Sequence, residues 1–132
     1  MRQPSCIRDC REPIIHLQDY AALEILFHEA SHAWDAKIAT AIKTIAAEKK
    51  MVPPPELWHM VIFYTAGELT RAELSEVQIP DYIPYAYRNK LYERGKQQAE
   101  CALKRHWLPF LEAKTDYKQA LKNVVLHSAD CK

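Results

Sequence analysis

Glycine is scarce in this sequence: the 132 residues include only Gly67 and Gly95. Tight hairpins, phosphate-binding loops and dinucleotide-binding turns rely on glycine, because glycine alone adopts positive φ at little steric cost. The scarcity therefore argues against a hairpin-rich fold and against a nucleotide-binding domain. We expect a mainly α-helical protein.

The sequence also lacks an excess of one charge and a long apolar run. It has 18 Lys and Arg residues against 17 Asp and Glu residues, for a net charge of +1. Nothing here favours a nucleic-acid partner or an anionic membrane. No apolar stretch is long enough to span a bilayer, and the N-terminal residues have no signal-peptide core. We expect no membrane association and, by default, a cytoplasmic location.

Length and composition predict a single domain, residues 1–132. With 48% hydrophobic and 27% charged residues, the chain is typical of a globular protein and unlike a disordered tail. Residues 1–18 contain two prolines and are expected to form an irregular arm, in which Ile14–Leu17 is the one candidate strand. Composition does not indicate an oligomeric state.

Four cysteines are too few for a disulfide scaffold, and they are Cys6, Cys10, Cys101 and Cys131. The default expectation is reduced thiols. A disulfide or a metal site that involves Cys6, Cys10 and Cys131 stays open as an alternative.

Apolar periodicity and proline positions predict four helices, over residues 20–50, 56–77, 89–107 and 116–127. Three consecutive prolines, 53–55, end the first helix, and Thr115 is expected to cap the last. The second helix is apolar around most of its circumference and should be central and buried. A Pro/Tyr-rich loop, 78–87, follows it. The prediction is a compact bundle of about four helices.

The first predicted helix contains the motif His28-Glu29-Ala30-Ser31-His32. Residues four apart project from one face of a helix, so His28 and His32 can share a tetrahedral zinc ion. Glu29 lies on the flank of that face, where it can reach a water on the metal and act as a general base. Glu24 and Asp35 lie beside the two histidines and can accept their outer N–H groups.

The opposite face of this helix is apolar, and its residues are Leu23, Leu26, Phe27, Ala30, Ala33 and Trp34. An apolar stripe of this width predicts contact with the core. We therefore expect the apolar stripe to be buried and the histidines to point away from it.

A catalytic zinc site needs a third protein ligand. Glu68 is the preferred candidate, because a carboxylate in a buried helix needs a partner or a metal. His59, in the same predicted helix, is the alternative. The two lie about 180° apart around that helix, so only one of them can face a metal held by His28 and His32.

His28, Glu29 and His32, followed by Tyr64 and Glu68 on one side of a second helix, resemble the zincin metallopeptidases and, among them, the gluzincin type. The resemblance implies a fold like the helical part of a zincin, a Zn²⁺ ion held by His28, His32 and Glu68, and a peptide or protein substrate. It assigns the general base to Glu29. It also assigns the stabilisation of the oxyanion to a hydroxyl from the loop, Tyr85 or Tyr87.

The sequence departs from the zincin pattern in two places. Zincins have a sheet before the active-site helix, whose edge strand pairs with substrate, whereas the helix here is predicted to begin near residue 20. Ala72 follows Glu68 where gluzincins commonly have an acidic residue. Two other interpretations therefore stay open: a non-catalytic helical metal-binding or interaction domain with a structural zinc, and a metal-free domain whose histidines pair with carboxylates.

Overall fold

The computed structural model of the protein describes residues 20–132. Over this range it contains helices, turns and loops and no strand, which confirms the prediction of a mainly helical bundle. The candidate strand Ile14–Leu17, the predicted arm, Cys6 and Cys10 lie outside the described residues.

The N-terminal part of the bundle is one interrupted helix packed on one long helix. Helix α2 (Ala21–Ser31) passes through a 3₁₀ turn, η2 (His32–Trp34), into α3 (Asp35–Glu48). Helix α4 (Leu57–Glu76) packs against both α2 and α3. Apart from the 3₁₀ turn, these helices agree with the predicted ranges 20–50 and 56–77.

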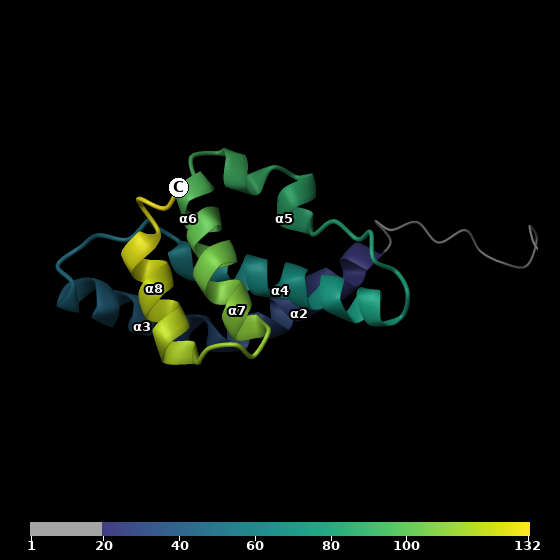
Figure 1. Ribbon diagram of the computed structural model, residues 1–132, viewed down its shortest axis with the longest axis horizontal. Helices are drawn as coiled ribbons and strands as arrows, with labels where there is room; N and C mark the ends of the chain where they lie inside the picture. Colours follow the sequence, from purple (N-terminus) through teal and green to yellow (C-terminus); the bar gives the residue numbers. More distant parts are fainter. Residues whose placement is uncertain (1–19) are drawn as a thin grey trace, which may run out of the picture.

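The C-terminal part consists of shorter elements, which are α5 (Tyr85–Arg88), η3 (Leu91–Glu93), α6 (Gln97–Ala102), the π-helical turn η4 (Leu103–Trp107), α7 (Leu108–Leu111) and α8 (Tyr117–His127). Figure 1 shows α8 beside the segment from α6 to α7, in front of α3 and α4. Helix α4 is thus covered on two sides. This explains why nine of its 20 residues are buried.

The hydrophobic core forms where α3, α4, α8 and the η4 turn meet. Its buried side chains include Ile42, Leu57, Val61, Leu103, Trp107, Leu121, Val124 and Val125. As predicted, α4 is the central helix. The apolar residues Ala120, Leu121, Val124 and Val125 of α8 are buried as well, whereas Tyr117 is 38% exposed.

The predicted helix over 89–107 is wrong at its start. Lys90 and Gly95 have φ values of 55° and 78°, so the backbone is not helical there, and α6 begins only at Gln97. The helical segment also continues past its predicted end at residue 107, since Pro109 lies in the first turn of α7, where proline removes no helical hydrogen bond. The cap of α8 is Asp116 rather than Thr115, since the Asp116 Oδ1 accepts the Gln119 N–H at 2.9 Å.

The predicted orientation of α2 is also wrong. Glu24 and His28 are only 2% and 9% exposed, whereas Leu26 is 63% exposed. The polar face is turned inward because it has partners there: His28 packs on Phe63 of α4, and Glu24 accepts hydrogen bonds from the 78–87 loop and α5. The apolar stripe of α2 is therefore largely on the surface.

Cys101 of α6 and Cys131 form a disulfide, with their Cα atoms 5.8 Å apart. The default expectation of reduced thiols is wrong for these two residues. The bond joins the C-terminal residues to α6, next to the end of α8.

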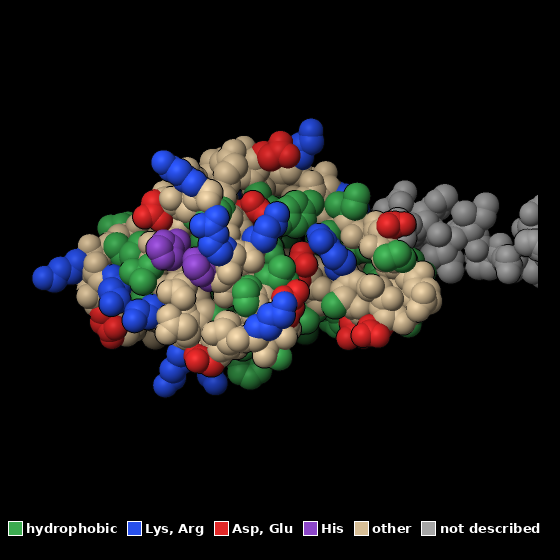
Figure 2. Space-filling model, viewed as in Figure 1, with side chains coloured by type: hydrophobic (Ala, Val, Ile, Leu, Met, Phe, Trp, Pro, Cys, Tyr) green, Lys and Arg blue, Asp and Glu red, His purple; other side chains and the backbone are tan. Residues whose placement is uncertain are grey.

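The face of the molecule that Figure 2 shows carries charges of both signs. Figure 2 shows positive and negative side chains scattered among apolar ones on the face that carries α6 and α8. Within residues 20–132, no helix combines the length and the apolar character needed to cross a membrane.

Candidate metal centre

Three histidines from three elements meet at the contact between α2 and α4. They are His28 in α2, His32 in the η2 turn and His59 in the first turn of α4. The His28 Nε2 atom lies 3.1 Å from the His32 Nε2 atom and 3.2 Å from the His59 Nε2 atom. The ligand atoms of all three lie within 4.8 Å of one another. Three imidazole nitrogens therefore converge on one small region.

This spacing fits a tetrahedral metal ion. With Zn–N bonds of about 2.0–2.1 Å, two nitrogens on one tetrahedral zinc are about 3.3 Å apart. The two measured separations from the His28 Nε2 atom are within a few tenths of an ångström of that value. Among the described residues, His28, His32 and His59 are the only group of three potential ligands this close together.

The outer nitrogens of two of these histidines face carboxylates. Asp35 Oδ2 lies 3.4 Å from the His32 Nδ1 atom, and Glu56 Oε1 lies 3.9 Å from the His59 Nδ1 atom. A carboxylate on the outer nitrogen keeps the inner nitrogen deprotonated and directed at a metal. The predicted role of Asp35 agrees with this geometry. Glu56 was not singled out in the sequence, although its position three residues before His59 on a helix could have indicated it.

His28 has no such partner among the described residues. Its Nδ1 atom is buried without a hydrogen bond, and the same is true of the Glu24 Oε2 atom. Glu24 was expected to accept a hydrogen bond from a histidine, but its Oε1 atom accepts the Tyr82 hydroxyl at 2.6 Å and the Tyr85 backbone N–H at 2.8 Å. Glu24 thus holds the loop and α5 against α2.

The surroundings favour the neutral form of two of the histidines, His28 and His59. Burial, together with the nearby His59 and His32 rings, lowers the pKa of His28 below its ordinary value of 6.5. Burial and His32 lower the pKa of His59 in the same way, although Glu56 partly opposes this. Neutral imidazoles are the form that binds metal, so these two side chains are ready to bind at neutral pH.

Aromatic rings enclose the histidines. The Phe63 ring centroid lies 4.2 Å from that of His28 and 4.8 Å from that of His59. The Trp58 ring stacks on His59 at 4.9 Å. Such packing restricts the rotamers of the imidazoles and limits the access of water.

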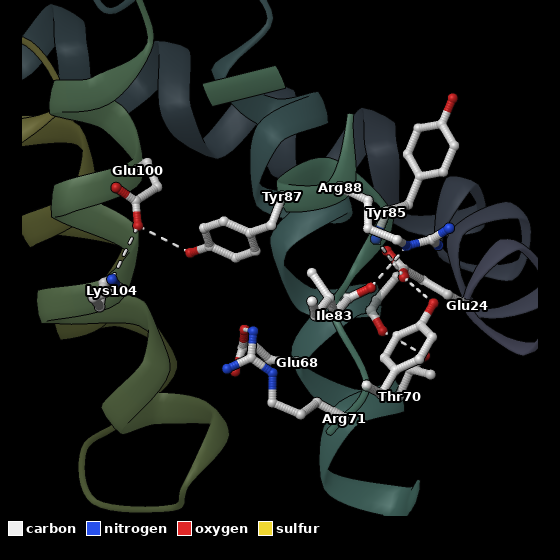
Figure 3. Close-up of polar contacts among 12 residues, drawn as sticks. Glu24, Glu68, Thr70, Arg71, Ile83, Tyr85, Tyr87, Arg88, Glu100 and Lys104 are labelled. Atoms are coloured by element: carbon white, nitrogen blue, oxygen red, sulfur yellow. Dashed lines mark hydrogen bonds and ion pairs between the residues drawn. The ribbon is translucent and has the colours of Figure 1, made fainter. Parts of the chain in front are cut away.

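The structure does not bring Glu68 to the histidines. Its carboxylate lies 3.3 Å from the Arg71 guanidinium, and burial raises its pKa, although Arg71 lowers it in part. Figure 3 shows Glu68 beside Arg71 on one side of α4, with Glu24 on the other side. His59 and Glu68 lie on opposite sides of α4, as their spacing predicts, and the histidine is the one that faces α2.

The other residues assigned from the sequence lie in different surroundings. Glu29 is exposed, next to His28 in α2. Tyr85 is 37% exposed, and its ring stacks parallel to Phe63 at 6.1 Å. The Tyr87 hydroxyl donates to Glu100 Oε2 at 2.9 Å, which directs it toward α6 (Figure 3). Tyr85 therefore stays near the histidines, whereas Tyr87 is engaged elsewhere.

A cavity of about 320 Å³ opens beside His59. Its walls come from the start of α4, from α5, and from η3 with the residues that follow it, and they include Glu56, Phe63 and Tyr85. The candidate metal centre therefore lies at the side of a cavity that can hold a small ligand.

No protein-family model, curated protein or solved structure with which the chain was compared matches it.

Proposed function

We propose that this protein is a zinc-dependent hydrolase that cleaves peptide bonds. The observation that carries the proposal is the convergence of the His28, His32 and His59 Nε2 atoms at tetrahedral spacing. The ligand set differs from the one that the zincin resemblance implies, because His59 takes the place of Glu68.

Two features support a catalytic rather than a structural metal. Catalytic zinc keeps one coordination position for water or substrate, whereas structural zinc has four protein ligands. No fourth His, Cys, Asp or Glu joins the three histidines among residues 20–132. The adjoining cavity gives a substrate a place beside the metal.

When bound, zinc would supply an acidified water and polarise the scissile carbonyl. Glu29 takes the proton from the attacking water and returns it to the leaving amine. The Tyr85 hydroxyl donates a hydrogen bond to the oxyanion that develops on the carbonyl oxygen. Asp35 and Glu56 orient His32 and His59 through the outer imidazole nitrogens.

One observation favours the second candidate, a non-catalytic metal-binding domain. Glu29 is exposed on α2. In that case the three histidines would hold the metal to join α2 to α4, and Glu29 would be a surface residue.

The disulfide between Cys101 and Cys131 bears on where this chemistry takes place. Such bonds persist in oxidising compartments and are rare in the cytosol. The disulfide therefore favours an oxidising compartment over the cytoplasmic location expected from the sequence.

Two measurements test the proposal. Mass spectrometry on protein without a histidine tag should find about one zinc per chain, and His28→Ala or His32→Ala should remove it. Zinc-loaded protein should then cleave members of a synthetic peptide mixture, and Glu29→Gln should lower the rate about 10²–10⁴-fold while it retains the metal.

Glu48→Gln, an exposed carboxylate in α3, is the matched control and should leave the rate unchanged. Bound zinc with full activity in Glu29→Gln would refute the role of Glu29. Bound zinc without cleavage of any peptide would favour the non-catalytic domain, and no bound zinc would refute both candidates.

A further inference from the structure

The cavity beside His59 has walls of two kinds. Most of its lining is apolar or aromatic, from Met60, Phe63, Tyr85, Leu91 and Tyr92. Lys96 is the one cationic side chain in the lining, and Glu56 is the one carboxylate. Glu56 is 65% exposed and lies beside the His59 Nδ1 atom, so it belongs to the outer edge of the cavity.

Lys96 is available for an anionic ligand. It is half-buried, and no described carboxylate lies within the 4.0 Å of an ion pair from its ammonium. Lys104 differs, because its ammonium is paired with Glu100 at 3.4 Å.

The size of the cavity limits the ligand. Its volume of about 320 Å³ is near the lower end of the range of about 300–1,000 Å³ for small-molecule sites. It can hold one end of a chain or one small molecule, but not a long peptide.

We infer that this cavity binds the C-terminal residue of a peptide. The free carboxylate lies against Lys96, and an apolar or aromatic side chain packs on Phe63, Tyr85 and Leu91. The peptide bond before that residue then lies toward His59. This inference rests on the proposed hydrolase function and makes the enzyme a carboxypeptidase-type exopeptidase, which releases one apolar residue at a time.

The chemistry of the walls supports this class of ligand. A lysine ammonium attracts a carboxylate and repels a free N-terminal amine, so it selects the C-terminal end of a peptide. Apolar walls favour a side chain such as Phe or Leu, because burial of apolar surface stabilises the bound state. A metal ion at the histidines would add positive charge and strengthen the same preference.

Binding of small probes tests the inference without any turnover. The probe is N-acetyl-L-phenylalanine, compared by calorimetry with its C-terminal amide and with N-acetylglycine, in zinc-loaded and metal-free protein. The acid should bind at least about tenfold more tightly than the amide or the glycine analogue. Lys96→Gln should remove the preference of acid over amide.

The matched control is Lys43→Gln, which removes an exposed lysine in α3 away from the cavity and should keep the preference. Circular dichroism checks that both variants fold. Equal binding of acid and amide, no binding of either, or a preserved preference in Lys96→Gln would each overturn the inference.

Activity separates this inference from the proposed function. Cleavage of a free-acid peptide but not of its C-terminal amide supports both. Equal cleavage of the two peptides refutes the inference about the cavity but is consistent with the proposed hydrolase function. If the protein binds the acid in preference to the amide through Lys96 but cleaves neither peptide, the cavity binds a C-terminal carboxylate and the proposed hydrolase function is refuted.

Discussion

At the scale of single residues, the orientation of each imidazole decides what the site can do. His28, His32 and His59 all direct the Nε2 atom inward, and two of them have a carboxylate at the outer nitrogen. This arrangement is suited to metal binding, because an imidazole whose outer nitrogen faces a carboxylate has a restricted orientation and loses little freedom on coordination.

Metal content should therefore depend on His59 and not on Glu68. We expect His59→Ala to abolish zinc binding, measured as zinc per chain after dialysis, because only two ligands would remain. Glu68→Gln should retain about one zinc per chain, since its carboxylate pairs with Arg71. The reverse result would show that the two histidines share their metal with Glu68.

The buried histidines also predict a pH dependence of stability. In the metal-free folded protein the pKa values of His28 and His59 lie below 6.5, whereas in the unfolded chain they return to about 6.5. As the pH falls through 6.5, the unfolded chain binds protons first, so the free energy of unfolding decreases. The contribution of the two neutral histidines to the free energy of unfolding is thus complete above pH 6.5 and is lost progressively below it.

Urea unfolding of metal-free protein between pH 7.5 and 5.5 measures this effect. His28→Asn and His59→Asn should each flatten the decrease, because each removes one of the shifted groups. A free energy of unfolding that stays constant over this range in the unmodified protein would contradict the prediction.

At the scale of elements, the contact between α2 and α4 positions the site. It joins His28 to His59 and also holds the loop and α5, because Glu24 of α2 accepts hydrogen bonds from Tyr82 and Tyr85. Gly67 of α4 lies at this junction, close to Pro84 and to Glu24. The loop can approach α4 only because residue 67 has no side chain.

Gly67→Ala should destabilise the protein, although Gly→Ala inside a helix usually stabilises by about 0.5–1 kcal/mol. A Cβ atom at residue 67 would lie 2.7 Å from the Pro84 Cβ atom and 3.3 Å from the Glu24 Oε2 atom. The proline must shift, so we expect a loss of about 1–3 kcal/mol in urea unfolding.

Ser75→Ala, at an exposed position of the same helix, is the control and should change stability by no more than about 0.5 kcal/mol. If Gly67→Ala is instead more stable than the unmodified protein, the loop does not pack on α4 as described.

At the scale of the whole molecule, the disulfide joins two segments that are 30 residues apart in the sequence. It encloses the η4 turn, α7 and α8, whose side chains supply much of the hydrophobic core. A cross-link over a loop of this length restricts the unfolded chain and stabilises the folded one.

Reduction of the disulfide should lower the free energy of unfolding by about 2–4 kcal/mol. Urea unfolding with and without dithiothreitol measures the difference. In the double variant Cys101→Ser with Cys131→Ser, the reductant should have little further effect. Equal stability of the oxidised and reduced protein would show that the bond does not stabilise this fold.

Features that depend on neighbours along the chain could be predicted from the amino-acid sequence. Few glycines and well-placed prolines predicted a helical bundle, and the spacing of His28 and His32 placed both imidazoles on one face, because helix geometry is local. The same rule correctly put His59 and Glu68 on opposite sides of one helix, so that only one of them could join the pair.

Which of these two residues joins His28 and His32 depends on how the helices pack. The rotation of α4 against α2 results from packing summed over the whole bundle, and no short segment encodes it. For the same reason, the amphipathic pattern of α2 did not reveal that Glu24 and His28 face inward, since their partners come from distant residues. The pairing of Cys101 with Cys131 likewise depends on how α6 and the C-terminal residues meet in space.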